Sequence, residues 1–313
     1  MREMLNVSSS PHIKHQETVS GIMTDVVIAL MPSAVYGCIL FGFKAAAVLL
    51  TCVGFAVLSE FLWDKALKKP NSVKDMSAVV TGLLLGMNLP PAIPLWQAAI
   101  GSIFAIIVVK QMFGGIGCNF ANPAIAARIM LLVSFPASMT RFTEPISDTV
   151  SSATPLLYAD GTKSFIYSFK TLFFGMHAGS IGETSAFLLL VGGMYLVIRR
   201  IISPVIPVCF IGTAALLSLI SGSNLAISVL GGGLILGAVF MATDYTTSPV
   251  SLLGKAIFGV GCGIITFVIR RFGALTEGVS YAILLMNILV PYIDRFTLSK
   301  PFGYIKPGKE KAE

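Results

Sequence analysis

Residues 23–63 read MTDVVIALMPSAVYGCILFGFKAAAVLLTCVGFAVLSEFLW, and only Asp25, Lys44 and Glu60 in this stretch are charged. A helix needs about 20 apolar residues to cross the hydrocarbon core of a bilayer. The stretch is long enough for two such helices that meet near Lys44. It therefore predicts a chain that lies in a membrane.

The composition of the whole chain supports this prediction. Of the 313 residues, 55% are hydrophobic and 12% are charged, whereas about 25% of a typical soluble domain is charged. So little polar surface cannot cover a globule in water. The net charge of +7 does not predict a nucleic-acid partner, because the basic residues lie between apolar runs. The five cysteines are dispersed without a CxxC pair, so we expect neither a disulfide framework nor a metal or iron–sulfur site.

The apolar runs predict ten membrane-spanning helices. Two of these runs, 76–90 and 122–136, are short for a full crossing, as broken or re-entrant helices are. The ten predicted spans are 23–43, 45–63, 76–90, 94–113, 122–136, 184–201, 204–220, 225–242, 254–271 and 277–294.

Short sequences recur at a spacing of about half the chain. GLLLG at 82–86 returns as GLILG at 233–237, and VVKQMFG at 108–114 resembles VIRRFG at 268–273. Each half would hold five spans, an odd number, so the halves would insert in opposite directions. The expected fold is an all-α integral membrane protein with about ten transmembrane helices, arranged as two inverted five-helix repeats with broken or short helices.

The basic residues predict the orientation. With ten spans, 16 of the 22 Lys and Arg fall on the side of both termini and 6 on the other, so the termini are expected in the cytoplasm. Arg270 and Arg271 break this rule locally, with Glu277 as a candidate partner. The predicted parts are a cytoplasmic segment 1–22, a first membrane repeat 23–139, an extracytoplasmic loop 140–183, a second membrane repeat 184–294 and a basic cytoplasmic tail 295–313.

Two cytoplasmic connections carry unusual polar residues, GGIGCNFANPA at 114–124 and MATDYTTSPVS at 241–251. The N–H groups at a helix start can bind a polar or anionic ligand, which predicts a ligand or ion site between the repeats. Alternatively, Asn122, Asp244 and Ser248 only cap helices. The sequence shows no nucleophile–His–acid set, Walker motif or dinucleotide-binding motif, so we expect no catalytic residue here.

The loop 140–183 contains DTVSSAT at 148–154, followed by Pro155. Ser and Thr side chains compete for backbone hydrogen bonds, and Pro has no N–H, so this cluster predicts an irregular loop. A loop of this length in a compact protein is usually functional or disordered.

Several longer motifs together resemble one family, the D subunit of the Rnf complex, which is related to the B subunit of the sodium-pumping NADH:quinone oxidoreductase. The resemblance runs from about residue 10 to about residue 295. The motifs are SPHI (10–13), SAVVTGLLLGMNLPP (77–91), GGIGCNFANPA, LLVSFPASMT (131–140), DTVSSATPL (148–156), GSIGETS (179–185), MATDYTTSPVS and EGVSYAILLMN (277–287).

The resemblance implies a covalent cofactor on the extracytoplasmic loop. In this family a flavin transferase attaches FMN to a Thr through a phosphoester, at a motif Asp-x-x-(Ser/Thr)-Gly-Ala-Thr. Asp148, Ser151, Ala153 and Thr154 match, which makes Thr154 the expected attachment site. Ser152 replaces the usual Gly and lacks its conformational freedom.

Family members also hold a non-covalent riboflavin in the membrane part. The candidate contacts for riboflavin or for an ion are Asn119, Asn122, Asp244, Thr246 and Thr247.

The expected function is that of a membrane-embedded flavoprotein subunit of a ferredoxin:NAD⁺ oxidoreductase in the cytoplasmic membrane. It would carry electrons, contribute to Na⁺ or H⁺ translocation, and work only with the other subunits. One alternative is an inverted-repeat solute channel or transporter without a redox role; another is a structural scaffold. Covalent flavin on Thr154 discriminates between the redox protein and the transporter.

Overall fold

The computed structural model describes residues 18–68, 72–145, 150–151, 155–158, 168–183, 185–273 and 277–298. Helices dominate this part of the chain. In order, the elements are α1 (Val19–Phe41), α2 (Phe43–Ala66), η1 (Val73–Asp75), α3 (Ser77–Met87), α4 (Leu95–Phe104), η2 (Ala105–Gln111), α5 (Pro123–Ser134), α6 (Pro136–Met139), β1 (Phe142–Thr143), β2 (Val150–Ser151), η3 (Pro155–Tyr158), α7 (Phe169–Phe174), α8 (Ala186–Ile198), α9 (Val205–Ile220), α10 (Leu225–Leu230), α11 (Leu234–Leu236), η4 (Gly237–Met241), α12 (Leu252–Phe272) and α13 (Val279–Thr297).

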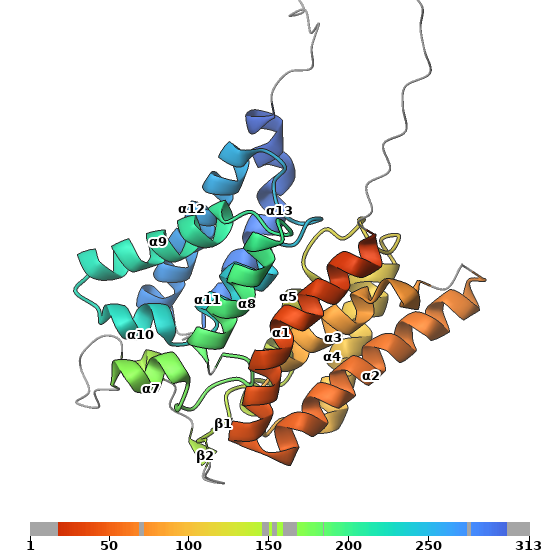
Figure 1. Cartoon of the computed structure of the whole chain (residues 1–313), viewed down its shortest axis with the longest axis horizontal. Coiled ribbons are helices and arrows are strands. Elements are labelled where there is room, and N and C mark those ends of the chain that lie inside the picture. The colour runs from red at the N-terminus through yellow and green to blue at the C-terminus, as the bar shows by residue number, and fades with distance from the viewer. Residues whose placement is uncertain are drawn as a thin grey trace, which may run out of the picture.

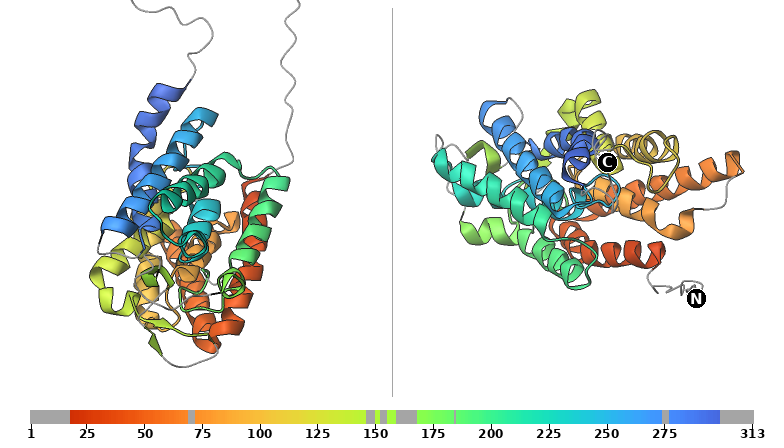
Figure 2. Two further views of the ribbon diagram at one scale, coloured as in Figure 1. Left: turned by 90° about the vertical axis from the view of Figure 1, so that its left-hand side faces the viewer. Right: turned by 90° about the horizontal axis from the view of Figure 1, so that it is seen from above.

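The helices form two halves that lie side by side (Figures 1 and 2). In the first half α2 packs against α3 and α4, and in the second half α9 and α13 pack against α12. The pairs α1–α8 and α5–α13 join the halves. The start of α1 and the end of α13 lie at one end of the molecule, and β1 and β2 lie at the other (Figure 1).

Every predicted span contains helix. By length and composition, α1, α2, α12 and α13 can each cross a membrane. The predicted short spans are short helices, since α3 has 11 residues and α5 has 12.

The predicted span 225–242 differs, because it is not one continuous helix. It is broken between Leu230 and Leu234, and α10, α11 and η4 share its length. The break contains Gly231, Gly232 and Gly233, and glycine disfavours a continuous helix because it has the most backbone freedom to lose.

The polar segment 140–183, predicted as an irregular loop, contains some regular structure. Strand β1 pairs antiparallel with β2, with Phe142 opposite Ser151. Helix α7 brings Phe169, Phe173 and Phe174 together, and the last two rings also contact Phe187 at the start of α8. This apolar contact anchors the end of the segment to the helical core.

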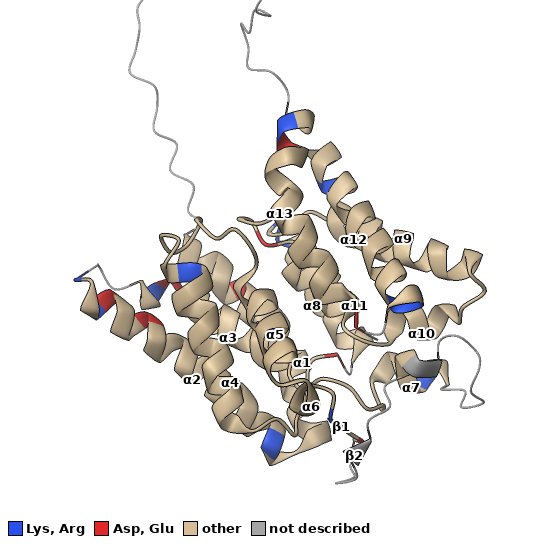
Figure 3. Cartoon of the chain, turned by 180° about the vertical axis from the view of Figure 1, so that it is seen from behind, with Lys and Arg blue, Asp and Glu red and all other residues tan. Residues whose placement is uncertain are grey.

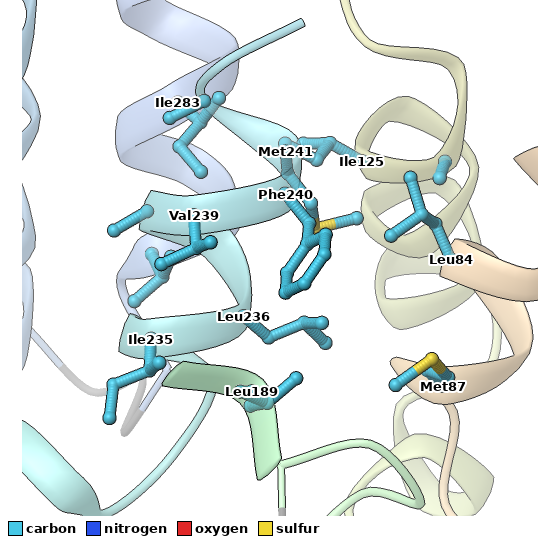
Figure 4. Close-up of a cluster of buried hydrophobic side chains, with 14 of the residues drawn as sticks. Leu84, Met87, Ile125, Leu189, Ile235, Leu236, Val239, Phe240, Met241 and Ile283 are labelled. Carbon is cyan, nitrogen blue, oxygen red and sulfur yellow. The ribbon is translucent and has the colours of Figure 1, made fainter. Parts of the chain in front are cut away.

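Apolar side chains fill the boundary between the halves and also cover the outside. Figure 4 shows Phe240 and Met241 of η4 near Ile125 of α5 and Leu84 of α3. The outer helix faces expose large apolar residues, such as Leu50, which is 73% exposed. Charged residues are sparse along the helices (Figure 3). This distribution suits helices that face lipid.

Candidate functional site

The two polar connections predicted as a ligand site line one pocket. Its empty volume, including space open to solvent, is about 800 Å³. Asn119, Asn122, Asp244 and Thr246, four of the five predicted contact residues, lie on its wall. The other wall residues are Met23, Val26, Ser77, Val80, Thr81, Leu84, Lys110, Ile116, Gly117, Pro123, Leu196, Ile201, Ile202, Phe240, Thr243 and Tyr245.

Asn122 both caps a helix and joins the halves. Its Oδ1 accepts hydrogen bonds from the N–H groups of Ala124 at 3.0 Å and Ile125 at 3.3 Å, as an N-cap of α5 does. Its Nδ2 donates to the carbonyl oxygen of Met241, 3.3 Å away. The capping alternative is therefore correct for Asn122 but incomplete, because the same side chain also binds the second connection.

A second asparagine strengthens this junction. When the Asn287 amide is oriented to match its neighbours, its nitrogen donates to the carbonyl oxygens of Thr247 and Ile283, and its oxygen accepts the N–H of Asn122. Asn287 lies in α13 and is buried. Through Asn122, hydrogen bonds therefore connect the lining of the pocket to α5, η4 and α13.

Two polar groups on the pocket wall remain able to bind a ligand. The buried Oδ1 of Asn119 accepts no hydrogen bond from the described residues. Asp244 does not cap α12; that role belongs to Ser251, whose Oγ accepts the N–H of Gly254. Instead, Oδ2 of Asp244 accepts hydrogen bonds from the hydroxyls of Thr246 at 3.1 Å and Thr247 at 3.2 Å. Burial raises the pKa of Asp244, and these hydrogen bonds oppose the rise.

A buried ion pair borders the pocket and was missed from the sequence. Lys110 at the end of η2 lies 2.8 Å from both carboxylate oxygens of Glu60 in α2, and it donates to Ser77 Oγ at 2.7 Å. Gln111 and Ser72 also donate to Glu60. We call these five residues the Lys110 cluster. Glu60 is fully buried, with 0% of its surface exposed. A charge inside an apolar run was the available signal.

A second buried cluster lies between the halves. Arg128 in α5 pairs with Glu277 and, at 3.4 Å, with Glu183. It also donates to Asn88 Oδ1 at 2.9 Å and Ser280 Oγ at 3.0 Å. We call these five residues the Arg128 cluster. The side chain of Arg128 is 5% exposed within the protein.

Glu277, the predicted partner of Arg270 and Arg271, forms its ion pair with Arg128 instead. Arg270 donates through Nη1 to the carbonyl oxygen of Ser228, 2.7 Å away.

Most of the predicted flavin-attachment motif lies outside the described residues. This holds for Asp148, Ser152, Ala153 and Thr154. Only the backbone of Ser151 is described, in β2. The next element, η3, starts at Pro155 and packs against α10.

The chain resembles known proteins over nearly its whole length. It is 47% identical to the D subunit of the Na⁺-translocating ferredoxin:NAD⁺ oxidoreductase complex of Acetobacterium woodii over 310 residues, which cover 98% of each chain. It is 42% identical to the D subunit of the proton-translocating ferredoxin:NAD⁺ oxidoreductase complex of Clostridium ljungdahlii over 321 residues, or 96% of this chain and 97% of the relative. It is 37% identical to the D subunit of the ion-translocating oxidoreductase complex of Stutzerimonas stutzeri over 337 residues, or 94% and 95%. A model of the NQR2, RnfD, RnfE family matches residues 6–303, and the chain belongs to this family.

Proposed function

We propose that this chain is the membrane-embedded D subunit of an ion-translocating ferredoxin:NAD⁺ oxidoreductase, and that it carries covalent FMN on Thr154. The observation that carries the proposal is the 47% identity to such a protein over 98% of both chains. The long apolar helices agree with a membrane location. The other subunits of the complex would be its partners and would bind NAD⁺ and ferredoxin.

The flavin proposal rests on the motif from Asp148 to Thr154. The Thr154 hydroxyl would form a bond to the flavin phosphate, and an activated donor such as a flavin adenine dinucleotide would lose AMP as its pyrophosphate bond breaks. The transferase would supply this reaction, while the chain supplies the acceptor. The bound flavin would accept and donate electrons.

The proposed topology has ten membrane segments in two inverted repeats, within the cytoplasmic membrane. Two pairings support it, because α2 packs on α4 in the first half as α9 packs on α12 in the second. The start of α1 and the end of α13 lie at the same end of the molecule, which fits two cytoplasmic termini (Figure 1). Strands β1 and β2 lie at the opposite end, which fits an extracytoplasmic flavin loop.

The pocket at the termini end is our candidate site for a non-covalent riboflavin. Its residues fit a flavin, because the pocket combines apolar lining residues such as Leu84 and Phe240 with Asn119, whose Oδ1 is an unpartnered acceptor. An isolated acceptor of this kind suits an N–H donor on a ring ligand. Acid extraction of the purified chain, followed by chromatography of the released flavin, tests this assignment.

The buried charges are the described groups best suited to the proposed role in Na⁺ or H⁺ translocation. Charged side chains inside a membrane protein usually mark ion or proton paths. The Lys110 cluster borders the pocket, and the Arg128 cluster lies between the halves, so a path along the boundary of the halves would meet both.

The decisive experiment is intact-mass analysis with in-gel flavin fluorescence, after co-expression with the flavin transferase. We expect wild type to gain the mass of one FMN less one water. Thr154→Ala should show no gain, whereas Thr149→Ala, a matched change in the same loop, should keep the adduct.

If wild type gains no mass while a control substrate is labelled, Ser152→Gly separates the remaining explanations. An adduct on this variant would mean that Ser152 blocks modification. No adduct on either protein would favour a transporter without a redox role. A flavin-bearing chain whose Thr154→Ala variant still supports electron transfer and ion pumping would instead be a structural scaffold.

A further inference from the structure

An apolar groove lies between α8 and α9 on the outer surface of the second half. Both helices pack on η4, whereas they make little direct contact with each other, and Val239 of η4 lines the groove between them. The empty volume of the groove, including space open to solvent, is about 1090 Å³, and every residue that lines it is apolar or a glycine. Met194 of α8 and Val208 of α9 are exposed at its edges. The groove therefore opens on a surface that suits lipid.

The groove continues into a second cavity that has a basic wall. Val197, Ile202 and Pro204 line both. The second cavity has an empty volume of about 770 Å³, and its lining includes Arg200 and Lys255 but no acidic residue. Neither basic side chain forms an ion pair with another described residue. Two unpaired positive charges therefore lie at one end of an apolar groove.

The basic cavity lies at the end of the molecule that holds the start of α1 and the end of α13. Arg199, at the end of α8, pairs with Asp25 near the start of α1. Ser251, at the start of α12, donates a hydrogen bond to Thr297 at the end of α13. The charge count predicts that this end is cytoplasmic. From there the groove extends along α8 over residues 190–197, which is about 10 Å of helix and about a third of the hydrocarbon core.

We propose that the groove and its basic end bind one anionic phospholipid, with the phosphate beside Arg200 and Lys255 and an acyl chain between α8 and α9. Basic pockets between membrane helices on the cytoplasmic side bind anionic lipid head groups, and both arginine and lysine bind phosphate. A free phosphate would leave the groove empty, and an apolar helix of another subunit would leave the two cations unmatched. An anionic amphiphile suits both parts, and this inference does not depend on the flavin.

The test is native mass spectrometry of the full chain, released from micelles that contain equal amounts of dioleoyl phosphatidylglycerol and dioleoyl phosphatidylcholine. The two lipids have the same acyl chains, but only phosphatidylglycerol has a net negative charge. The mass of each adduct identifies the lipid that the protein retains. One basic residue beside an anionic lipid gives about a fivefold preference. With two such residues, we expect wild type to retain phosphatidylglycerol with about a 25-fold preference.

The head-group part is tested by removing each positive charge. Arg200→Gln and Lys255→Gln should each lower the preference by about fivefold, and the double variant should have none. Lys68→Gln is the matched control, because Lys68 is also an exposed basic residue that follows a helix, with a φ of 52° against 57° for Arg200. The control should keep the wild-type preference.

Gly212→Leu tests the acyl-chain part independently. Gly212 lines the groove, and a Cβ added to it meets no other atom within 4 Å, so the larger side chain would project into the groove. The variant should retain less of both lipids, with an unchanged preference between them. Gly54→Leu in α2 is the control, because a Cβ on Gly54 also meets nothing within 4 Å. It should retain as much lipid as wild type.

Equal retention of the two lipids by wild type, or an unchanged preference in the double variant, would overturn the head-group site. An undiminished amount of lipid on Gly212→Leu would overturn the groove as the acyl-chain site. Displacement of the lipid by inorganic phosphate would also overturn the proposal, because it would show that the basic cavity binds phosphate without the groove. A wild-type chain that retains neither lipid would leave the groove to a helix of another subunit.

Discussion

The two buried charged clusters hold the molecule together in different ways. The Lys110 cluster is local, because its residues come from α2, η2, the start of α3 and the segment between α2 and α3, all in the first half. The Arg128 cluster connects the halves, because Arg128 and Asn88 belong to the first and Glu277 and Ser280 to the second.

The clusters also differ in how fully their charges are matched. Lys110 directs its ammonium at Glu60 and Ser77, and Glu60 has further donors in Ser72 and Gln111. Arg128 forms ion pairs with two carboxylates, those of Glu183 and Glu277. Oε1 of Glu277 has no hydrogen-bond partner among the described residues. The local cluster should therefore tolerate the loss of its cation better than the cluster between the halves.

The largest expected effect follows from Arg128→Met. The substitution leaves Glu183 and Glu277 buried without their cation, and breaking a buried ion pair from one side costs about 3–5 kcal/mol. We expect a loss at the upper end of that range in the free energy of unfolding, measured in mixed micelles. Adding Glu277→Gln should restore only part of it, because Glu183 remains unpaired. Full recovery of the free energy of unfolding in the double variant would show that burial of Glu183 does not require the ion pair with Arg128.

The same substitution in the local cluster, Lys110→Met, should cost less, about 3 kcal/mol. Glu60 would keep the hydrogen bonds from Ser72 and Gln111. Adding Glu60→Gln should restore nearly all the stability, because no other carboxylate among the described residues is hydrogen-bonded to Lys110. A loss equal to that of Arg128→Met, measured in the same micelles, would contradict the difference between the clusters.

The sequence predicted the helical segments well but not these clusters. An apolar run of about 20 residues identifies a helix even when one residue in it is charged, as Lys110 and Arg128 are. Which charges meet depends on packing between distant segments. Lys110 and Glu60 are 50 residues apart, and Arg128 and Glu277 are 149 apart. No local pattern reports such a pairing.

The candidate pocket, unlike the clusters, was predictable from the sequence. Polar residues cluster in two connections that the sequence predicts on the same side of the membrane, and the structure brings four of the five predicted contact residues into the lining of one pocket. The unpartnered state of Asn119 Oδ1 was not predictable, because it depends on which donors the folded chain brings near that oxygen. The break at Gly231–Gly233 could have been anticipated from the three consecutive glycines.

A smaller effect is expected at the pocket end of the boundary, from Asn122→Ala. The substitution removes the N-cap of α5 and the hydrogen bond to Met241, which together contribute about 2 kcal/mol. Asn224→Ala is the matched control, because Asn224 caps α10 in the same way but is exposed. The control should lose about 1 kcal/mol or less. Equal losses in the two variants, measured by thermal unfolding, would mean that the contact between the halves adds nothing to the cap.

The smallest effect concerns Asp244, beside the same junction, and it depends on pH. Burial raises its pKa above the ordinary 3.8, so the folded chain keeps this proton at a pH where the unfolded chain has lost it. Stability must therefore fall as pH rises through the interval between the two pKa values. The Asp244→Asn variant has no titratable group at this position, and the amide oxygen of the new side chain can still accept the hydrogen bond from the Thr246 hydroxyl. The Tm of the variant should exceed that of wild type above the interval and converge with it in acid. A constant difference at every pH would show that Asp244 is ionised alike in both states. Asp244 would then carry a full negative charge at neutral pH without a cation bonded to it among the described residues, whereas the charge of Glu60 is balanced by Lys110.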